Sequence, residues 1–215
     1  DGSEGLMSAS AVACVGKHLY EKGLVRNPKS ITVETQSGVR HLALNTRYGV
    51  AVSGKVNLGP PNFSPQSIPV NLPGEKILGR VVDIGGGIFS ITCVSMGSPH
   101  CVMFCDDVEN ARVEAIGPKI ELAPIFPKRS NVEFVQVLDE NTLKMRIWER
   151  GDGETPASGS GACASVVAAV ENGFCARSLP VRVIQNGGEM TVDYTGSDVI
   201  LDCKVHKVFE GEVEI

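Results

Sequence analysis

An internal repeat is the feature of this sequence that most limits the folds it can adopt. When Ser8 is set against Ser158, residues 8–38 and 158–188 run in register without a gap. Each copy contains a short loop, a helix-like run that ends at a glycine, a strand, a tight turn and a second strand. A supersecondary unit repeated in register indicates an internal duplication. Two such halves usually pack about a pseudo-twofold axis, so we expect their helix N-termini to face one shared cleft.

The start of the second copy is the segment richest in potential chemistry. A strand of alternating apolar residues ends at Trp148, a charged and glycine-rich loop follows, and a helix of small residues begins near Ala162. The first N–H groups of a helix have no partner within it and lie at the positive end of its dipole, so they suit a carboxylate or a phosphate. The plainer interpretation is a glycine loop that caps a buried helix. The second copy at Ser8 favours an anion site, where Ser8 and Ser158 flank the α-carbon of a carboxylate substrate.

Composition excludes several classes of protein. Of 215 residues, 42% are hydrophobic and 21% charged, which is ordinary for a globular protein. A net charge of −5 without a basic cluster argues against a nucleic-acid partner, and no apolar run is long enough to span a membrane. The seven cysteines sit in apolar contexts and are expected to be reduced, buried thiols of a cytoplasmic protein. We expect no metal, because Cys101 and Cys105 have no further ligand pair.

Periodicity and turn residues predict mostly β structure with three helices. Five prolines between Gly59 and Pro73 indicate an extended crossover between two domains. We therefore expect one domain of residues 1–74 plus 207–215 and another of residues 75–206. The predicted helices cover residues 12–22, 107–119 and 162–172, and the predicted strands cover residues 30–35, 39–45, 48–56, 76–83, 88–95, 101–105, 132–138, 143–148, 181–185, 190–194, 199–204 and 207–215.

Four motifs in this order make the chain resemble the diaminopimelate epimerase family of cofactor-independent amino-acid racemases and epimerases. The resemblance covers most of the chain. The motifs are Asp1-Gly2-Ser3-Glu4 followed by Met7, Met96-Gly97-Ser98-Pro99-His100, Phe126-Pro127 with Asn131-Val132, and Glu149-Arg150-Gly151-Asp152-Gly153-Glu154-Thr155.

The resemblance implies an α+β fold of two pseudo-symmetric domains, each a mixed or antiparallel barrel-like sheet around a central helix. The first domain would be incomplete, because the family has an opening segment that this chain lacks. The implied reaction inverts one α-carbon of LL-diaminopimelate to give meso-diaminopimelate, in the route to lysine and peptidoglycan. It needs neither pyridoxal phosphate nor a metal: one thiolate removes the α-proton and a second thiol returns a proton to the opposite face. The family also implies a homodimer with an amino-acid substrate.

Site residues follow from the same motifs. The resemblance places Ser8 and Ser158 at the proton-transfer positions, with His100 and Glu149 as the groups that tune them. It places substrate contacts at the helix N-termini, at the turn before His100, and at the substrate's distal end, with the following residues: Ala9, Ser10, Ser98, Asn131, Glu149, Arg150, Gly159 and Ser160.

The chain departs from the family pattern at the catalytic positions themselves. Ser8 and Ser158 stand where the family has cysteine, and Ala9-Ser10-Ala11 stands where it has Gly-Asn-Gly. Ser98 replaces an asparagine, and Ala13 replaces an arginine. A serine hydroxyl ionises far less readily than a thiol, so without a dedicated base neither serine can accept the α-proton. We therefore expect the chain to be inactive or impaired as an epimerase. The alternatives are a racemase of another amino acid and a non-catalytic binding protein that keeps the cleft.

Overall fold

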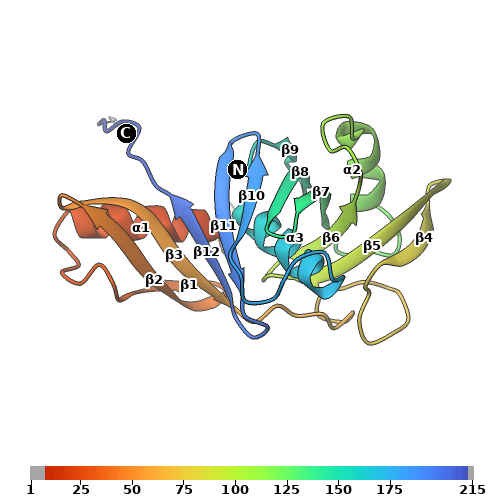
Figure 1. The fold of residues 1–215 in the computed structure, drawn as a ribbon, viewed down its shortest axis with the longest axis horizontal. Coiled ribbons are helices and arrows are strands. Elements are labelled where there is room, and N and C mark those ends of the chain that lie inside the picture. Colours follow the sequence, from red (N-terminus) through yellow and green to blue (C-terminus); the bar gives the residue numbers. More distant parts are fainter. Residues whose placement is uncertain (1–7, 213–215) are drawn as a thin grey trace. The chain divides into compact units, whose positions relative to one another are not determined.

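The structure is a computed structural model that describes residues 8–212 (Figure 1). The motif expected at Asp1–Glu4 with Met7 lies outside the described residues. Mixed β-sheet and three helices make up the described part of the chain, which matches the expected α+β class. The elements are α1 (Ala9–Glu21), β1 (Ile31–Thr35), β2 (Gly38–Arg47), β3 (Val50–Gly59), β4 (Arg80–Ile84), β5 (Gly87–Ser95), β6 (Pro99–Phe104), α2 (Val113–Glu121), β7 (Asn131–Asp139), β8 (Thr142–Glu149), β9 (Gly153–Thr155), α3 (Gly159–Glu171), β10 (Val181–Gln185), β11 (Gly188–Tyr194) and β12 (Val199–Lys204).

These elements form two compact units. The first contains residues 8–56 and 202–212 of the described chain, and the second contains residues 57–201. The division into domains of residues 1–74 plus 207–215 and 75–206 stays a prediction.

The repeat inferred from the sequence is present in the structure. Helix α3 begins and ends 150 residues after α1, and both helices have thirteen residues. The antiparallel hairpins β1–β2 and β10–β11 have the same register at the same displacement, because Ile31 pairs with Leu42 and Val181 with Val192. Ser8 and Ser158 cap their helices in the same extended conformation, and each Oγ accepts a hydrogen bond from the third N–H that follows.

In the first unit, α1 packs closely against β2 and β3. A Cβ added to Gly16 would lie 1.9 Å from a methyl carbon of Leu42, and one added to Gly54 would lie 2.9 Å from Ala13 Cβ. Lys17 also joins helix to strand, since its Nζ donates to the Ala51 carbonyl at 2.7 Å. Small residues on both elements therefore decide how near the helix comes to the sheet.

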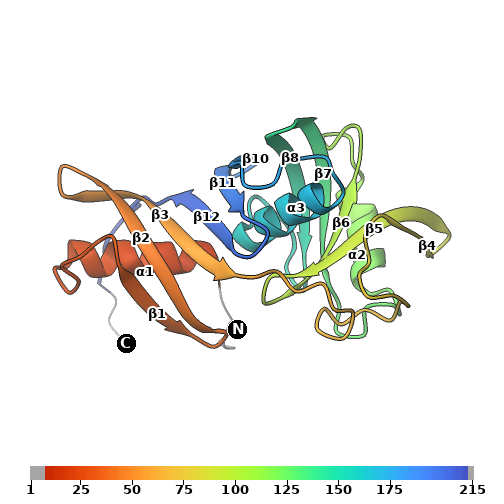
Figure 2. The ribbon, with the colours of Figure 1, turned by 60° about the horizontal axis from the view of Figure 1, so that its bottom comes forward.

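In the second unit, α2 and α3 cover opposite faces of one sheet (Figure 2). Neighbouring residues of a strand point to opposite faces. Ile147 of β8 lies against Gly161 of α3, while Trp148 lies against Gly117 of α2. The strands of this sheet run in the order β11-β10-β8-β7-β6-β5-β4, with β9 paired to β8. The pairs β6–β7 and β8–β10 are parallel, and the other neighbouring pairs in this order are antiparallel.

Two expected elements are wrong. The helix expected at residues 107–119 runs from Val113 to Glu121, because Asp107 accepts hydrogen bonds from the N–H groups of Glu109 and Asn110 and closes a turn instead. The tail expected as a strand over residues 207–215 is irregular over residues 205–212. Its alternating pattern finds no sheet surface there, since Val208 and Phe209 are 88% and 85% exposed.

The cysteines follow the expectation only in part. Cys93, Cys101, Cys163, Cys175 and Cys203 are buried and reduced. Cys14 is exposed on α1, and Cys105 is half-buried. Cys14 sits beside Val15 on the side of α1 that faces solvent, so its apolar neighbours in the sequence did not predict its burial.

The two repeated helices should differ in stability. Eleven of the thirteen residues of α3 are buried, against five of α1. Native-state hydrogen exchange should therefore show slower exchange for amides in the middle of α3 than for those in the middle of α1, because opening α3 exposes more apolar surface. Equal protection of the two helices would contradict this expectation.

Candidate active site

Helix α3 begins at a residue whose own side chain and backbone are both held. Ser158 Oγ accepts from the Gly161 N–H at 3.3 Å, and the Ser158 N–H donates to Gln185 Oε1 at 2.8 Å. Ser158 is 7% exposed. Glycine is required at position 161, because an added Cβ would lie 2.6 Å from Ile147 and 3.3 Å from Glu133 Oε1. The N-terminal turn of α3 therefore lies directly against β7 and β8.

The pairing of β6, β7 and β8 brings polar side chains to this turn. Glu133 pairs with Ile147, which faces α3, and paired residues share a face. Asn131 and Glu149 lie two residues from these along the same strands, so they share that face. His100 pairs with Asn131 across the parallel β6–β7 ladder. Strand register thus places four polar residues beside the start of α3: His100, Asn131, Glu133 and Glu149.

Glu149 connects the loop to the helix cap. Its Oε1 accepts from Thr155 Oγ1 at 2.5 Å, and its Oε2 accepts from Ser158 Oγ at 3.4 Å. Ser160 Oγ lies 3.5 Å from Ser158 Oγ. The structure thus brings together the predicted residues Glu149, Ser158 and Ser160, with Gly159 between the two serines. A carboxylate beside Ser158 orients the hydroxyl, but a carboxylate is too weak a base to ionise an aliphatic alcohol.

His100 belongs to a chain of three side chains. Its Nε2 lies 3.0 Å from Ser98 Oγ, and its Nδ1 lies 2.6 Å from Glu133 Oε1. The side chains of His100 and Glu133 are fully buried, while Ser98 is half-buried. Ser98 and His100 were predicted site residues. Glu133 was not, although it stands in phase with Asn131 on an alternating strand, which is the signal that could have identified it.

Burial raises the pKa of the Glu133 carboxyl above its usual range. The charge of His100 and its hydrogen bond act in the opposite direction, and the negative charge of Glu149 adds to the rise. The second carboxyl oxygen, Oε2, is buried and has no hydrogen-bond partner among the described residues.

Asn131 and Arg150 hold the Glu149 loop as well as being predicted ligand contacts. Asn131 Nδ2 donates to the Pro99 carbonyl at 3.0 Å, and Asn131 Oδ1 accepts from the Arg150 N–H at 2.9 Å. The Arg150 guanidinium donates to the Lys128 carbonyl at 3.2 Å. Asn131 thus ties the turn before His100 to the turn after Glu149.

Glu121 of α2 is a second residue that the sequence did not single out. Its Oε2 accepts from the Trp148 indole N–H at 2.7 Å, and its Oε1 accepts from the Gly151 N–H at 3.1 Å. Glu121 is 5% exposed. One carboxylate therefore holds the chain on both sides of Glu149 and Arg150.

The first unit contains the other predicted residues. Ser8 is exposed and its Oγ lies 3.3 Å from Ser10 Oγ, as Ser158 Oγ lies near Ser160 Oγ in the second unit. Ala9 is 1% exposed, so its side chain belongs to the core and only its backbone can serve a ligand.

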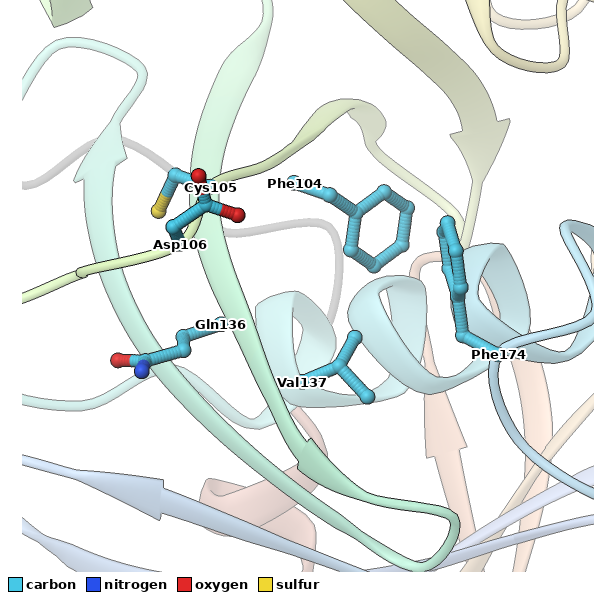
Figure 3. A pocket seen from close by; sticks show the side chains of 6 residues that line it. All are labelled: Phe104, Cys105, Asp106, Gln136, Val137 and Phe174. Atoms are coloured by element: carbon cyan, nitrogen blue, oxygen red, sulfur yellow. The ribbon is translucent and has the colours of Figure 1, made fainter.

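A separate cavity of about 300 Å³ lies at the far end of β6 from His100 (Figure 3). The rings of Phe104 and Phe174 meet there edge to face, with centroids 4.7 Å apart. Burial and the charge of Asp106 raise the pKa of the Cys105 thiol, so this cavity offers no reactive thiolate. None of the predicted site residues lines it.

Solved structures define the class of this fold. The chain is similar to a probable proline racemase from Agrobacterium radiobacter (TM-score 0.64, 16% identity, 92% of this chain and 64% of that one). It is also similar to a hydroxyproline epimerase from Agrobacterium vitis (TM-score 0.64, 18% identity, 92% and 62%) and to a phenazine biosynthesis protein of the PhzF family from Bacillus anthracis (TM-score 0.62, 16% identity, 96% and 78%). The chain therefore has the fold of these three proteins, and it spans less than two thirds of the first two.

Sequence comparison gives the family. The diaminopimelate epimerase family model matches residues 92–207. The chain is 45% identical to the diaminopimelate epimerase of Acetivibrio thermocellus, over 100% of this chain and 76% of that protein. It is 42% identical to the diaminopimelate epimerase of Pelotomaculum thermopropionicum, over 99% of this chain and 75% of that protein. The chain belongs to the diaminopimelate epimerase family, whose members are cofactor-independent isomerases of lysine biosynthesis. No helix in residues 8–212 is long and apolar enough to cross a membrane.

Replacing Glu133 by glutamine should change how stability depends on pH. A carboxyl whose pKa is raised by folding stabilises the folded state at low pH, and this contribution is lost as the pH rises through the folded-state pKa. The unmodified protein should therefore lose stability relative to Glu133→Gln as the pH rises above about 4, the usual pKa of a glutamate. The quantity compared is the difference between their free energies of unfolding. Urea titrations at several pH values measure this difference.

The exposed Glu140 in the turn between β7 and β8 provides the matched control. Glu140→Gln should give a smaller change of this difference with pH than Glu133→Gln, because the Glu140 side chain is exposed to solvent. A difference for Glu133→Gln that grows with pH would show that the folded protein favours the ionised carboxyl.

Replacing Glu121 by glutamine should destabilise the protein by about 1–3 kcal/mol, because the amide NH₂ would face a buried N–H donor from Trp148 or Gly151. Glu114→Gln, an exposed change on the same helix, should cost less than about 0.5 kcal/mol. Denaturant unfolding measures both, and equal effects would show that the two hydrogen bonds contribute little.

Proposed function

We propose that the site at the start of α3 binds the α-carboxylate of an amino acid, in the manner required for the family reaction. That reaction converts LL-diaminopimelate to meso-diaminopimelate. The observation that carries the proposal is the cap of α3, where Ser158 lies within 3.4 Å of Glu149 Oε2 on the same face of the sheet as His100. The N–H groups of the first helical turn supply the donors for a carboxylate.

Inversion of an α-carbon requires a proton acceptor on one face and a proton donor on the other. Ser158 stands at one proton-transfer position, and Ser8, the equivalent residue of the repeat, stands at the other. Donors that hold the α-carboxylate also stabilise the negative charge that develops on it when the α-proton leaves. Asn131 and Arg150 would contact the distal end of the substrate, beside the loop that Asn131 fixes.

The hydroxyls at these two positions limit the proposed activity. Ser158 Oγ has Glu149 as its carboxylate neighbour, and Ser8 Oγ has Ser10. Neither neighbour is a base strong enough to ionise an alcohol, whereas a thiol at a helix N-terminus ionises near neutral pH. The proposed site therefore has donors that would hold a carboxylate, and hydroxyls where the family resemblance implies thiols.

The finer parts of the family resemblance belong to the same proposal. We propose two pseudo-symmetric domains, each a barrel-like sheet around its helix, α1 or α3, and a cytoplasmic homodimer. The internal repeat supports the first part, and the reduced cysteines support the cytoplasm. Light scattering coupled to size-exclusion chromatography tests the dimer, which a monomer mass at micromolar concentration would contradict.

The unmodified chain should leave the α-proton of LL-diaminopimelate in place. Each positioned acid or base contributes about 10²- to 10⁴-fold, so the loss of two should remove most of the rate. The measurement is the α-proton signal by ¹H NMR in D₂O, together with calorimetry of the same ligand. Binding without exchange supports the proposal. Exchange at the rate of an active epimerase would show that another residue is the base.

Restored thiols should recover exchange only in combination. Ser158→Cys alone should recover little, because residues that act as a pair are not additive. Ser8→Cys with Ser158→Cys should recover more once Ala9 and Ala11 are glycine and Ser10 is asparagine. The same combination with Ser160→Cys in place of Ser158→Cys is the matched control, since it adds a thiol to the same turn at the wrong position.

A further inference from the structure

We propose that Glu133 is a positioning residue which, through His100, decides whether the Ser98 hydroxyl accepts a hydrogen bond from the ligand or donates one to it. The proposal rests on the proposed function and takes Ser98 as the substrate contact that the family resemblance implies. It follows from the continuous chain of contacts Glu133 Oε1–His100 Nδ1 at 2.6 Å and His100 Nε2–Ser98 Oγ at 3.0 Å.

The first state has an ionised Glu133 and a neutral His100. A carboxylate oxygen only accepts, so the imidazole proton must be on Nδ1, where it donates to Glu133. Nε2 then carries a lone pair and accepts the hydroxyl proton of Ser98. With its only proton used in this way, Ser98 Oγ can only accept from a ligand, so it selects a donor such as an ammonium group.

The second state has one more proton on the buried pair. A proton on Nε2 has an acceptor at once, because Ser98 Oγ lies 3.0 Å away. A proton on Glu133 Oε2 would have none, since that atom is buried without a partner among the described residues. The added proton therefore belongs on Nε2, which donates to Ser98. The Ser98 hydroxyl proton then turns outward and donates to a ligand acceptor such as a carboxylate.

The groups around Glu133 oppose one another. His100 on β6 and the positive end of α3, which reaches Glu133 at Gly161, favour the ionised carboxyl. Glu149 at the end of β8 and the apolar contact of Ile147 with the same helical turn favour an added proton. Because these groups act in opposite directions, neither protonation state of the Glu133–His100 pair dominates over the whole range of pH.

Ser98 precedes His100 in a turn that contains Gly97, whose φ of 97° is a conformation that favours glycine. The turn holds Ser98 next to the ring, since its Oγ lies 3.0 Å from His100 Nε2. The Glu133–His100 pair is fully buried, whereas Ser98 is half-buried and can contact a ligand. The direction of the Ser98 hydrogen bond to that ligand therefore depends on the protonation of the buried pair.

The test follows the ring nitrogens of His100 by ¹⁵N NMR of histidine-labelled full chain across pH, with the resonance assigned by His100→Asn. Nε2 should be bare at high pH and protonated at low pH. In Glu133→Gln the midpoint should move down by about one to three pH units, because the negative partner is lost. In Glu140→Gln, the exposed control, it should not move.

A ligand arm uses two probes, LL-diaminopimelate and pimelate, which is the same dicarboxylate without amino groups. Calorimetry should show that raising the pH through the midpoint favours diaminopimelate over pimelate by about tenfold, the value of one hydrogen bond to a charged group. Ser98→Ala should remove this pH dependence, and Glu133→Gln should move it down by the same roughly one to three pH units as the Nε2 midpoint.

An Nε2 that stays bare at low pH, or a midpoint unchanged in Glu133→Gln, would overturn the relay. A preference that persists in Ser98→Ala would overturn the role of Ser98. Failure of both dicarboxylates to bind would contradict the proposed function instead, while the nitrogen signals still decide the relay without any ligand.

Discussion

The close approach of α3 to the strands beneath it is the constraint on which the second unit depends. Most side chains of this helix are no larger than valine, so the helix can be buried on nearly every side. At Gly161, where the helix meets β7 and β8, a Cβ would clash with Ile147 and crowd Glu133. The first turn of the helix is therefore enclosed by protein, in surroundings where hydrogen bonds and charges act strongly. An exposed helix end would bind an anion weakly, because water screens its dipole.

Burial of this helical turn explains why the loop before it is held by several hydrogen bonds. Glu149, Asn131 and Glu121 hold the loop that connects β8 to α3 through side chains, backbone N–H groups and one indole. Each of these groups would be costly to bury alone. Together they give the Glu149 loop a single arrangement beside Ser158, which is what a site that must orient an α-carbon requires.

The polar groups beside the start of α3 include two carboxylates, Glu133 and Glu149. Glu133 contacts His100, and Glu149 contacts the Ser158 hydroxyl. The chain belongs to the diaminopimelate epimerase family although Ser8 and Ser158 stand where the family resemblance implies cysteine, because the scaffold and the reactive atoms are specified by different residues.

The sequence by itself determined the repeat, most of the helices and strands, and the motifs that identify the family, because these depend on spacing and periodicity within short segments. It also indicated Ser158, Glu149 and His100, although no observation tests their catalytic roles. Only the tertiary structure decided that Glu133 contacts His100 and that Glu121 contacts Trp148 and Gly151, because strand pairing and helix packing bring these groups together across about 30 residues of chain. The start of α2 and the irregular tail were decided in the same way, by an aspartate turn and by the lack of a sheet surface to cover.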